Sequence, residues 1–210
     1  MQTNLTEKMS TKEKILQVSI NLFSQKGYSG VSVREITREV GIKESSLYNH
    51  FKNKEEILES IFSIFREEFS KLVPPFEFLD EIISKSTVED FLLRGYENFR
   101  THINHPVNEK FWRILYIEHY REPLAREIFL NDIIKGTIDF LESAFEKFIQ
   151  LGKMKAYPTK LLASEYQYPL FSMHAEYNML RFDGKDTSEI EQKMKDHIQF
   201  FLEHVTETKN

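Results

Sequence analysis

The chain contains no cysteine, and only seven glycines and six prolines occur among its 210 residues. Without cysteine there can be no disulfide framework, no thiolate metal site and no cysteine nucleophile. No alternating apolar run flanked by hairpin turns is present, which argues against a β-sheet protein. No apolar stretch approaches the length of a transmembrane helix, and the opening MQTNLTEKMS lacks the apolar core of a signal peptide. We therefore expect a cytoplasmic protein without a membrane association.

The residues that are present favour helix along the whole chain. Apolar residues make up 40% and charged residues 29%, which is typical of a globular protein with a real core. Capping signals stand where helices should begin, among them Ser10 with Glu13 and Ser86 with Glu89. The predicted fold class is all-α, with about nine helices. They are expected at roughly 11–26, 33–40, 44–51, 54–72, 87–104, 107–120, 123–151, 159–182 and 187–206.

The charge is distributed unevenly, which indicates two domains. Residues 1–55 hold nine Lys or Arg and six Glu, a net charge of +3, within a chain whose net charge is −5. The remainder therefore carries −8. A basic end on an acidic body fits nucleic-acid binding confined to one domain. We predict a DNA-binding domain over 1–55 and a larger helical domain over 56–210.

The segment SVREITREVGIKESSLYNHFKNKEEIL, residues 32–58, has the pattern of a helix-turn-helix unit. Two short amphipathic helices flank Gly41, which supplies the permissive turn position. In such a unit the second helix enters the DNA major groove while the first crosses the backbone. The apolar faces of the two helices are expected at Val33, Ile36 and Val40, and at Ile42, Leu47 and Phe51.

Two motifs extend this pattern into a resemblance. The sequence has an ILxxxxxLFxxxGY opening from Ile15 to Tyr28, followed by LYxHFxxKxxxL from Leu47 to Leu58. In these residues, about a quarter of the chain, it resembles the TetR family of bacterial transcriptional regulators. That resemblance implies a three-helix DNA-binding domain, a helical ligand-binding and dimerisation domain, and most often a repressor. Glu44-Ser45 departs from the family pattern at the start of the reading helix, so base preference does not carry over.

The polar residues around the second helix are the candidates for DNA contact. Tyr48 joins an apolar ring to a hydroxyl, Asn49 could pair with adenine, and Lys43 could reach guanine or a phosphate. Lys54 opens the next helix, where its ammonium and free backbone N–H groups would suit a phosphate. The predicted DNA-binding residues are Ser32, Arg34, Lys43, Ser45, Ser46, Tyr48, Asn49, His50 and Lys54.

The second half of the chain is rich in aromatic residues and contains the single tryptophan, in FWRILYIEHY. A large apolar site with few polar anchors would suit a lipophilic or aromatic effector. The alternative is a plain packed core. The candidate pocket residues are Phe111, Trp112, Leu115, Tyr116, His119, Tyr166, Phe171, His174 and Tyr177.

The last two long helices carry apolar stripes that a partner could cover. The family resemblance implies a two-fold homodimer with a four-helix interface, which would place two reading helices on successive major grooves of a palindromic operator. The candidate interface residues are Leu161, Leu162, Tyr168, Ala175, Phe182, Ile190, Met194, Ile198, Phe201, Leu202 and Val205.

The sequence contains little that supports a metal-binding protein or an enzyme. His102 and His105 have helical i, i+3 spacing, but no acid completes a recognisable metal set, so neither a metal nor another cofactor is expected. No G-x-S-x-G, P-loop, H-E-x-x-H or dinucleotide fingerprint is present, and no enzyme is expected. The alternative to an effector-responsive regulator is a DNA-binding protein of the same fold that is controlled by a protein partner.

Overall fold

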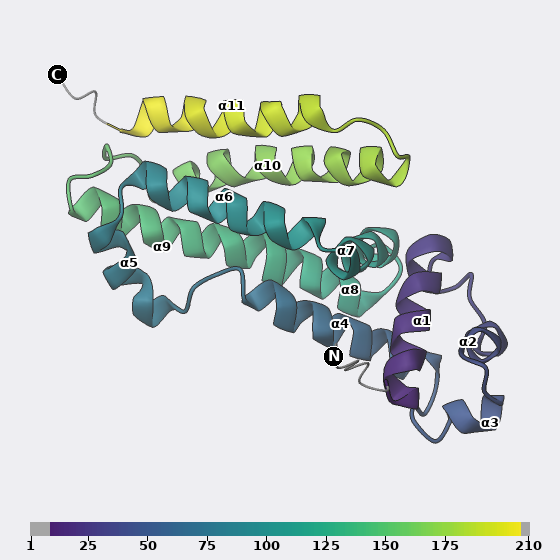
Figure 1. Ribbon diagram of the computed structural model, residues 1–210. Helices are drawn as coiled ribbons and strands as arrows, with labels where there is room; N and C mark the ends of the chain where they lie inside the picture. The colour runs from purple at the N-terminus through teal and green to yellow at the C-terminus, as the bar shows by residue number, and fades with distance from the viewer. Residues whose placement is uncertain (1–8, 207–210) are drawn as a thin grey trace, which may run out of the picture. The chain divides into compact units, whose positions relative to one another are not determined.

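The computed structural model describes residues 9–206, and these residues form helices joined by short connections (Figure 1). Eleven α-helices, a 3₁₀-helix (η1) and a π-helix (η2) follow one another in this part of the chain. Their bounds are α1 Thr11–Lys26, α2 Val33–Val40, α3 Glu44–Leu47, α4 Lys54–Ser70, η1 Phe76–Phe78, α5 Leu79–Lys85, α6 Val88–Asn104, α7 Pro106–Glu118, α8 Pro123–Glu127, η2 Ile128–Lys135, α9 Gly136–Gln150, α10 Thr159–Phe182 and α11 Ser188–Val205.

The helices group into two compact units that do not follow the chain in a simple order. Unit 1 contains the chain up to Glu67 together with Pro106–Arg126, and unit 2 contains Glu68–His105 and Glu127 onward. The domain boundary predicted after residue 55 lies beside the start of α4, whereas the packing keeps most of α4 with the first three helices. The reason is that α4 and α7 share the core of unit 1, where the ring of Phe65 meets that of Trp112 edge-on at 5.3 Å.

Unit 2 is built around α9, α10 and α11. Helix α10 packs against α9 on one side and α11 on the other, and α10 and α11 form an antiparallel hairpin (Figure 1). Phe145 of α9, Tyr166 of α10 and Phe201 of α11 meet in its core, with ring centroids 5.0–6.3 Å apart. Pro169 lies inside α10, where the helix continues without a break.

Most predicted helices are found within two residues of their expected ends. The exceptions have local causes. The regular part of α3 ends at Leu47, and residues 48–50 form turns. The helix expected over 123–151 begins as α8, opens into the π-helix η2 and continues as α9. Helix α5 and η1 were not predicted.

The capping signals were partly correct. Ser10 and Glu13 form a reciprocal capping box at the start of α1, as predicted. At α6 the predicted pair was wrong by one residue. Thr87 caps the helix and Asp90 completes the box, which leaves Ser86 outside. Both pairs have the same spacing, so the sequence alone did not distinguish them.

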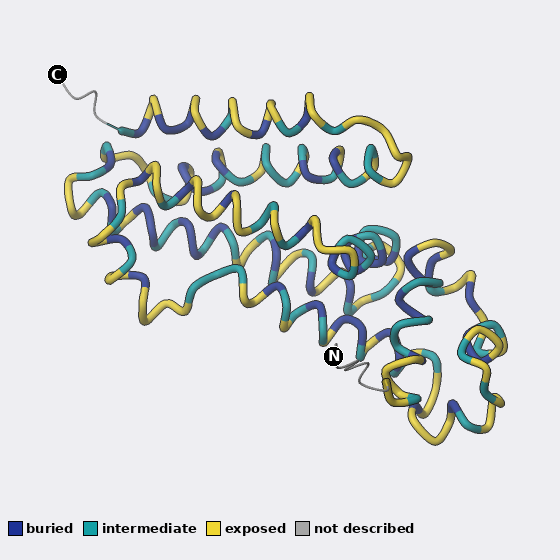
Figure 2. The backbone as a smooth tube through the Cα atoms, in the orientation of Figure 1, coloured by how far each residue is buried: buried dark blue, intermediate teal, exposed yellow. Residues whose placement is uncertain are grey.

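Seven of the predicted interface residues are buried within the protein itself. Figure 2 shows the buried residues of α11 on the side that faces α10 and the exposed ones on the opposite side. The prediction that these side chains face a partner was therefore wrong, because they supply the core of unit 2. They are Leu162, Ile190, Met194, Ile198, Phe201, Leu202 and Val205.

His174 is a buried titratable group in this core. Its ring meets Phe99 edge-on at 4.9 Å and stacks on Tyr177, and its Nε2 pairs with the amide Nδ2 of Asn178 at 3.0 Å. Burial lowers the pKa of His174 to about 3, and His102 adds a smaller effect in the same direction. The imidazole is therefore neutral in the folded protein at neutral pH.

A neutral buried histidine makes stability depend on pH. The unfolded chain takes up a proton near pH 6.5, whereas the folded chain does not until about pH 3. As the pH falls from 6.5, the free energy of unfolding should fall by up to about 1.4 kcal/mol per pH unit from this residue. We predict that His174→Phe loses less stability between pH 7 and pH 5 than the native protein. Urea unfolding at pH 7, 6 and 5 measures this, and parallel curves for the two proteins would contradict it.

Candidate nucleic-acid interface and ligand cavity

The helix-turn-helix unit is formed by α2, the turn at Gly41 and α3. Gly41 adopts φ 78° and ψ 35°, the left-handed conformation that ends α2, and its N–H bonds to the carbonyl of Thr37 at 3.0 Å. Ile36, Leu47 and Phe51 are almost completely buried, as predicted for the core of the unit. The sequence pattern thus predicted the turn and the buried centre of both inward faces, whereas Val33, Val40 and Ile42 are half-buried.

The opposite face of this unit carries most of the predicted DNA-contact residues. Tyr48 caps the C-terminal end of α3 and is 52% exposed, so its ring is available to a partner. Ser32 caps α2 by accepting a hydrogen bond from the backbone N–H of Glu35, so its hydroxyl is already used in positioning that helix. Exposed side chains on or beside the two helices are Ser32, Arg34, Lys43, Ser45, Tyr48, Asn49 and His50, with Ser46 half-buried.

Lys54 is placed differently from the prediction. It is half-buried, and its ammonium donates to the backbone carbonyls of Tyr28 at 2.9 Å and Val31 at 2.8 Å. The same ammonium lies 4.1 Å from the centroid of the Tyr28 ring. Burial lowers the pKa of Lys54, and the carboxylates of Glu118 and Glu122 oppose that shift. Lys54 therefore holds the connection between α1 and α2, and phosphate binding would compete with these contacts.

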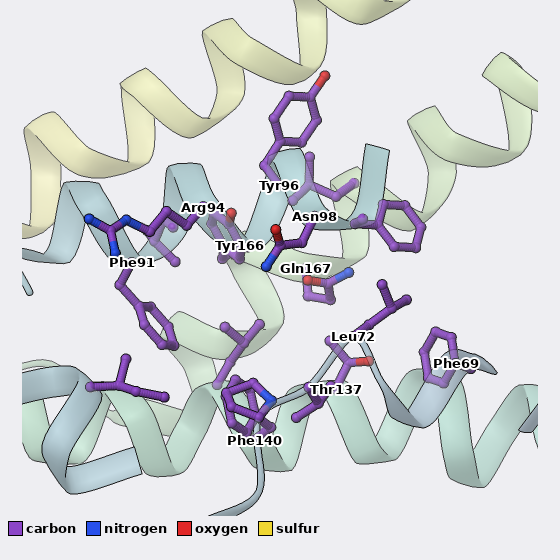
Figure 3. A pocket seen from close by; sticks show the side chains of 18 of the residues that line it. Phe69, Leu72, Phe91, Arg94, Tyr96, Asn98, Thr137, Phe140, Tyr166 and Gln167 are labelled. Carbon is purple, nitrogen blue, oxygen red and sulfur yellow. The ribbon is translucent and has the colours of Figure 1, made fainter. Parts of the chain in front are cut away.

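A cavity of about 430 Å³ lies within unit 2. Apolar side chains from α4, α6, α9 and α10 form most of its wall, and Figure 3 shows the amides of Asn98 and Gln167 directed into the same space. Two basic side chains, Lys71 and Arg94, line it, and the lining contains no acid. Apolar lining residues include Phe69, Leu72, Phe91, Phe99, Phe140, Leu141, Leu170 and Phe171.

The comparisons with known proteins agree with this arrangement. Residues 15–61 match the family described as "Bacterial regulatory proteins, tetR family". The probable HTH-type transcriptional regulator YttP of Bacillus subtilis is 29% identical over 153 residues, which cover 72% of this chain and 70% of YttP. IcaR of Staphylococcus epidermidis, a negative transcriptional regulator of the biofilm operon icaADBC, is 31% identical over 59% of each chain.

Residues 15–61 form a DNA-binding domain of the TetR family.

Solved structures of other transcriptional regulators have the same fold. The complex of SmeT, the repressor of a Stenotrophomonas maltophilia multidrug efflux pump, with triclosan superposes with a TM-score of 0.67, at 17% identity over 95% of this chain and 93% of SmeT. The fatty acid degradation regulator FadR of Bacillus halodurans gives 0.65, at 19% identity over 94% and 97% of the two chains. The curated relatives are transcriptional regulators, and residues 15–61 give this chain the DNA-binding domain of the TetR family.

The predicted effector pocket overlaps this cavity at Tyr166 and Phe171 only. Four predicted residues of α7 and His119, which directly follows α7, belong to unit 1, where Phe111 and Trp112 pack against Phe65 of α4. Their assignment to a pocket with α10 is therefore not supported by where they lie. The predicted residues that do not line the cavity are Phe111, Trp112, Leu115, Tyr116, His119, His174 and Tyr177.

Residues from α4, α6 and α9 line the cavity but were not predicted. Phe69, Asn98 and Thr137 are examples. Their helices have an amphipathic sequence pattern. That pattern does not predict which helix faces enclose a cavity. Among residues 9–206, none of the helices has the length and apolar character needed to cross a membrane, and no three His, Asp or Glu side chains gather as a metal site.

The exposed ring of Tyr48 provides a test of the DNA-binding face. We predict that Tyr48→Ala reduces affinity for a specific DNA site by at least about tenfold, since one good contact contributes roughly 1–3 kcal/mol. Stability should stay unchanged because the ring is outside the core. Fluorescence anisotropy with a DNA site selected from a random library measures the affinity.

Tyr157→Ala is the matched control, because Tyr157 is 51% exposed and lies in unit 2. It should bind the selected DNA like the native protein. Equal affinities for the two alanine variants would remove Tyr48 from the interface.

Proposed function

We propose that the protein is a homodimeric repressor that leaves a palindromic operator when a small, mainly apolar or aromatic effector enters the cavity of unit 2. The observation that carries this proposal is the combination of an exposed reading face on α3 with an apolar cavity in a separate unit. A regulator needs these two sites, and coupling between them equals the effector's difference in affinity for the two states. SmeT, a repressor with the same fold, has been solved with triclosan, which supports a small apolar ligand here.

The chemistry of the cavity wall supports an effector with an apolar body and few polar groups. The rings of Phe99 and Phe140 and the side chain of Leu170 provide the apolar wall, while Asn98 and Gln167 can donate and accept hydrogen bonds. A lining that includes two basic side chains and no acidic one disfavours a cationic effector. A neutral or anionic aromatic compound fits this wall best.

The outer face of α10 supports the homodimer. Leu161, Tyr168, Met179 and Phe182 are each more than half exposed, which is unusual for large apolar side chains on one helix. Together with Ala175 they fall on a repeat of three and four residues, the spacing of a helix–helix seam. A second copy of the same stripe, related by a two-fold axis, would cover it.

The dimer can be tested through Phe182, which is 56% exposed. We predict that Phe182→Glu sediments as a monomer and binds the selected DNA at least tenfold more weakly, because a carboxylate would be buried at the two-fold seam. The native protein should select a palindrome whose half-sites lie about 34 Å apart, one turn of DNA.

Leu93→Glu is the control for the dimer, since Leu93 is 42% exposed on α6. It should remain dimeric. If Phe182→Glu also sediments like the native protein, α10 does not form the interface.

Gly95 offers a way to fill the cavity without backbone strain. It lines the cavity within α6, its φ is not positive, and a Cβ built there meets nothing within 4 Å. We predict that Gly95→Leu weakens binding of the aromatic sulfonate dye anilinonaphthalene sulfonate by about tenfold or more. Dye fluorescence measures this directly.

Gly95→Ala is the matched control. It should raise helix stability by up to about 1 kcal/mol and still bind the dye, because one methyl leaves most of the cavity open. Undiminished dye binding by Gly95→Leu would show that this cavity is not the ligand site. In that event a regulator controlled by a protein partner becomes the better account.

A further inference from the structure

The corner between α1 and α2 is fixed by contacts from two helices. Tyr28 lies between Gly27, which ends α1, and Val31, which precedes α2. Its backbone N–H donates to Oε1 of Glu118 at 2.7 Å, and its backbone carbonyl accepts from Nζ of Lys54 at 2.9 Å. Both polar groups of one peptide-chain residue are thus bound by charged side chains. We call Lys54, Tyr28 and Glu118 the Tyr28 clamp.

Glu118 reaches this corner because α7 packs directly on backbone. Gly27 has φ 72° and ψ 162°, and a Cβ there would lie 3.1 Å from Oε1 of Glu118 and 3.2 Å from Cγ2 of Ile117. A side chain at residue 27 would therefore be strained and would displace the carboxylate. Gly27 allows both the turn and the close approach of α7.

The carboxylate of Glu118 is costly in this position. The residue is 1% exposed, and its second oxygen, Oε2, has no hydrogen-bond partner among the described residues. An incompletely paired buried carboxylate destabilises a fold, and a leucine would fill the same space at a lower cost. The contact with Tyr28 is what a leucine could not make. This points to a role in positioning the corner beyond filling the core.

The clamp also determines where the DNA-reading helices begin. Lys54 binds the carbonyl of Val31 at 2.8 Å as well as that of Tyr28, and Val31 is buried. The next residue, Ser32, is the N-cap of α2. A shift of the clamp would therefore move the start of α2 and, through the turn at Gly41, the reading helix α3.

Each side of the clamp is connected along the chain to the cavity wall. Lys54 is the first residue of α4, whose Phe69 lines the cavity near the other end of the same helix. Glu118 is the last residue of α7, and α7 follows α6 after the single residue His105. Helix α6 lines the cavity from Phe91 to Phe99.

We infer that Glu118 is a positioning residue through which α7 fixes the Tyr28 corner in the conformation that binds DNA, so that a ligand in the cavity controls DNA affinity partly by weakening the bond between Glu118 and Tyr28. This inference rests on the proposed function, because it requires DNA binding and a ligand in the cavity. It adds to that function a specific hydrogen bond, from the Tyr28 N–H to Oε1 of Glu118, that couples the cavity to DNA binding.

Three variants of the full-length chain test the role of Glu118. Glu118→Leu keeps the volume and removes the acceptor, and it should reduce affinity for the selected DNA at least tenfold while the protein stays dimeric and binds the dye. Glu118→Gln keeps a carbonyl oxygen that can accept from Tyr28, and its DNA affinity should be within about threefold of native. Glu122→Gln, the control, removes a charge that acts on Lys54 without removing a bond to Tyr28, and it should bind DNA like the native protein.

Native affinity in Glu118→Leu would overturn the inference, and so would equal losses in the leucine and glutamine variants. If the native protein bound no DNA or no dye, the proposed function would fail instead, so the two failures are distinguishable. Hydrogen exchange on the native protein covers the case in which Glu118→Leu does not fold. The Tyr28 amide should be more protected in the DNA complex than in the dye complex, and equal protection in both would also overturn the inference.

Discussion

The backbone of Tyr28 is the point on which the arrangement of the DNA-binding unit depends. It lies outside any helix, so its N–H and carbonyl have no intrahelical partners and must be satisfied by other groups. Glu118 and Lys54 supply them, one from α7 and one from α4. Hydrogen bonds to charged groups contribute roughly 1.5–3 kcal/mol each. Two such bonds on one residue restrict the corner to the conformation in which both are made.

This constraint explains why unit 1 includes a helix from the middle of the chain. Helices α2 and α3 are short and cannot enclose a core with α1 alone, so α4 and α7 complete it. Phe65, Phe111 and Trp112 are used for this purpose, with ring centroids 5.3 and 6.2 Å apart. These aromatic residues were predicted from the sequence to bind a ligand or fill a core. In the structure they pack in the core of unit 1, which supports the helix-turn-helix unit. The cavity forms elsewhere, from α4, α6, α9 and α10.

Helices α10 and α11 likewise contain apolar side chains that are buried within the unit and others that remain exposed. Ile198 and Phe201 repeat at helical spacing and are buried against their own unit, whereas Met179 and Phe182 remain exposed on α10. An apolar stripe in the sequence predicts that one face of a helix is buried. It does not predict whether that face packs against the same chain or against a second copy. Burial in the structure separates the two for the apolar residues of α11, and the exposed stripe on α10 supports the proposed homodimer seam there.

The sequence by itself determined the all-α class, most helix ends, the turn at Gly41 and the inward faces of the helix-turn-helix unit. These features depend on local rules, namely apolar periodicity, capping side chains and the conformational freedom of glycine, which operate within a few residues of one another. Tyr48 was correctly expected outside the core for the same reason. The tertiary structure alone decided the role of Lys54, the membership of α7 in unit 1, and the walls of the cavity. Each of these depends on contacts between residues that lie far apart in the chain, such as Tyr28 with Glu118, and local patterns carry no information about which distant faces will meet.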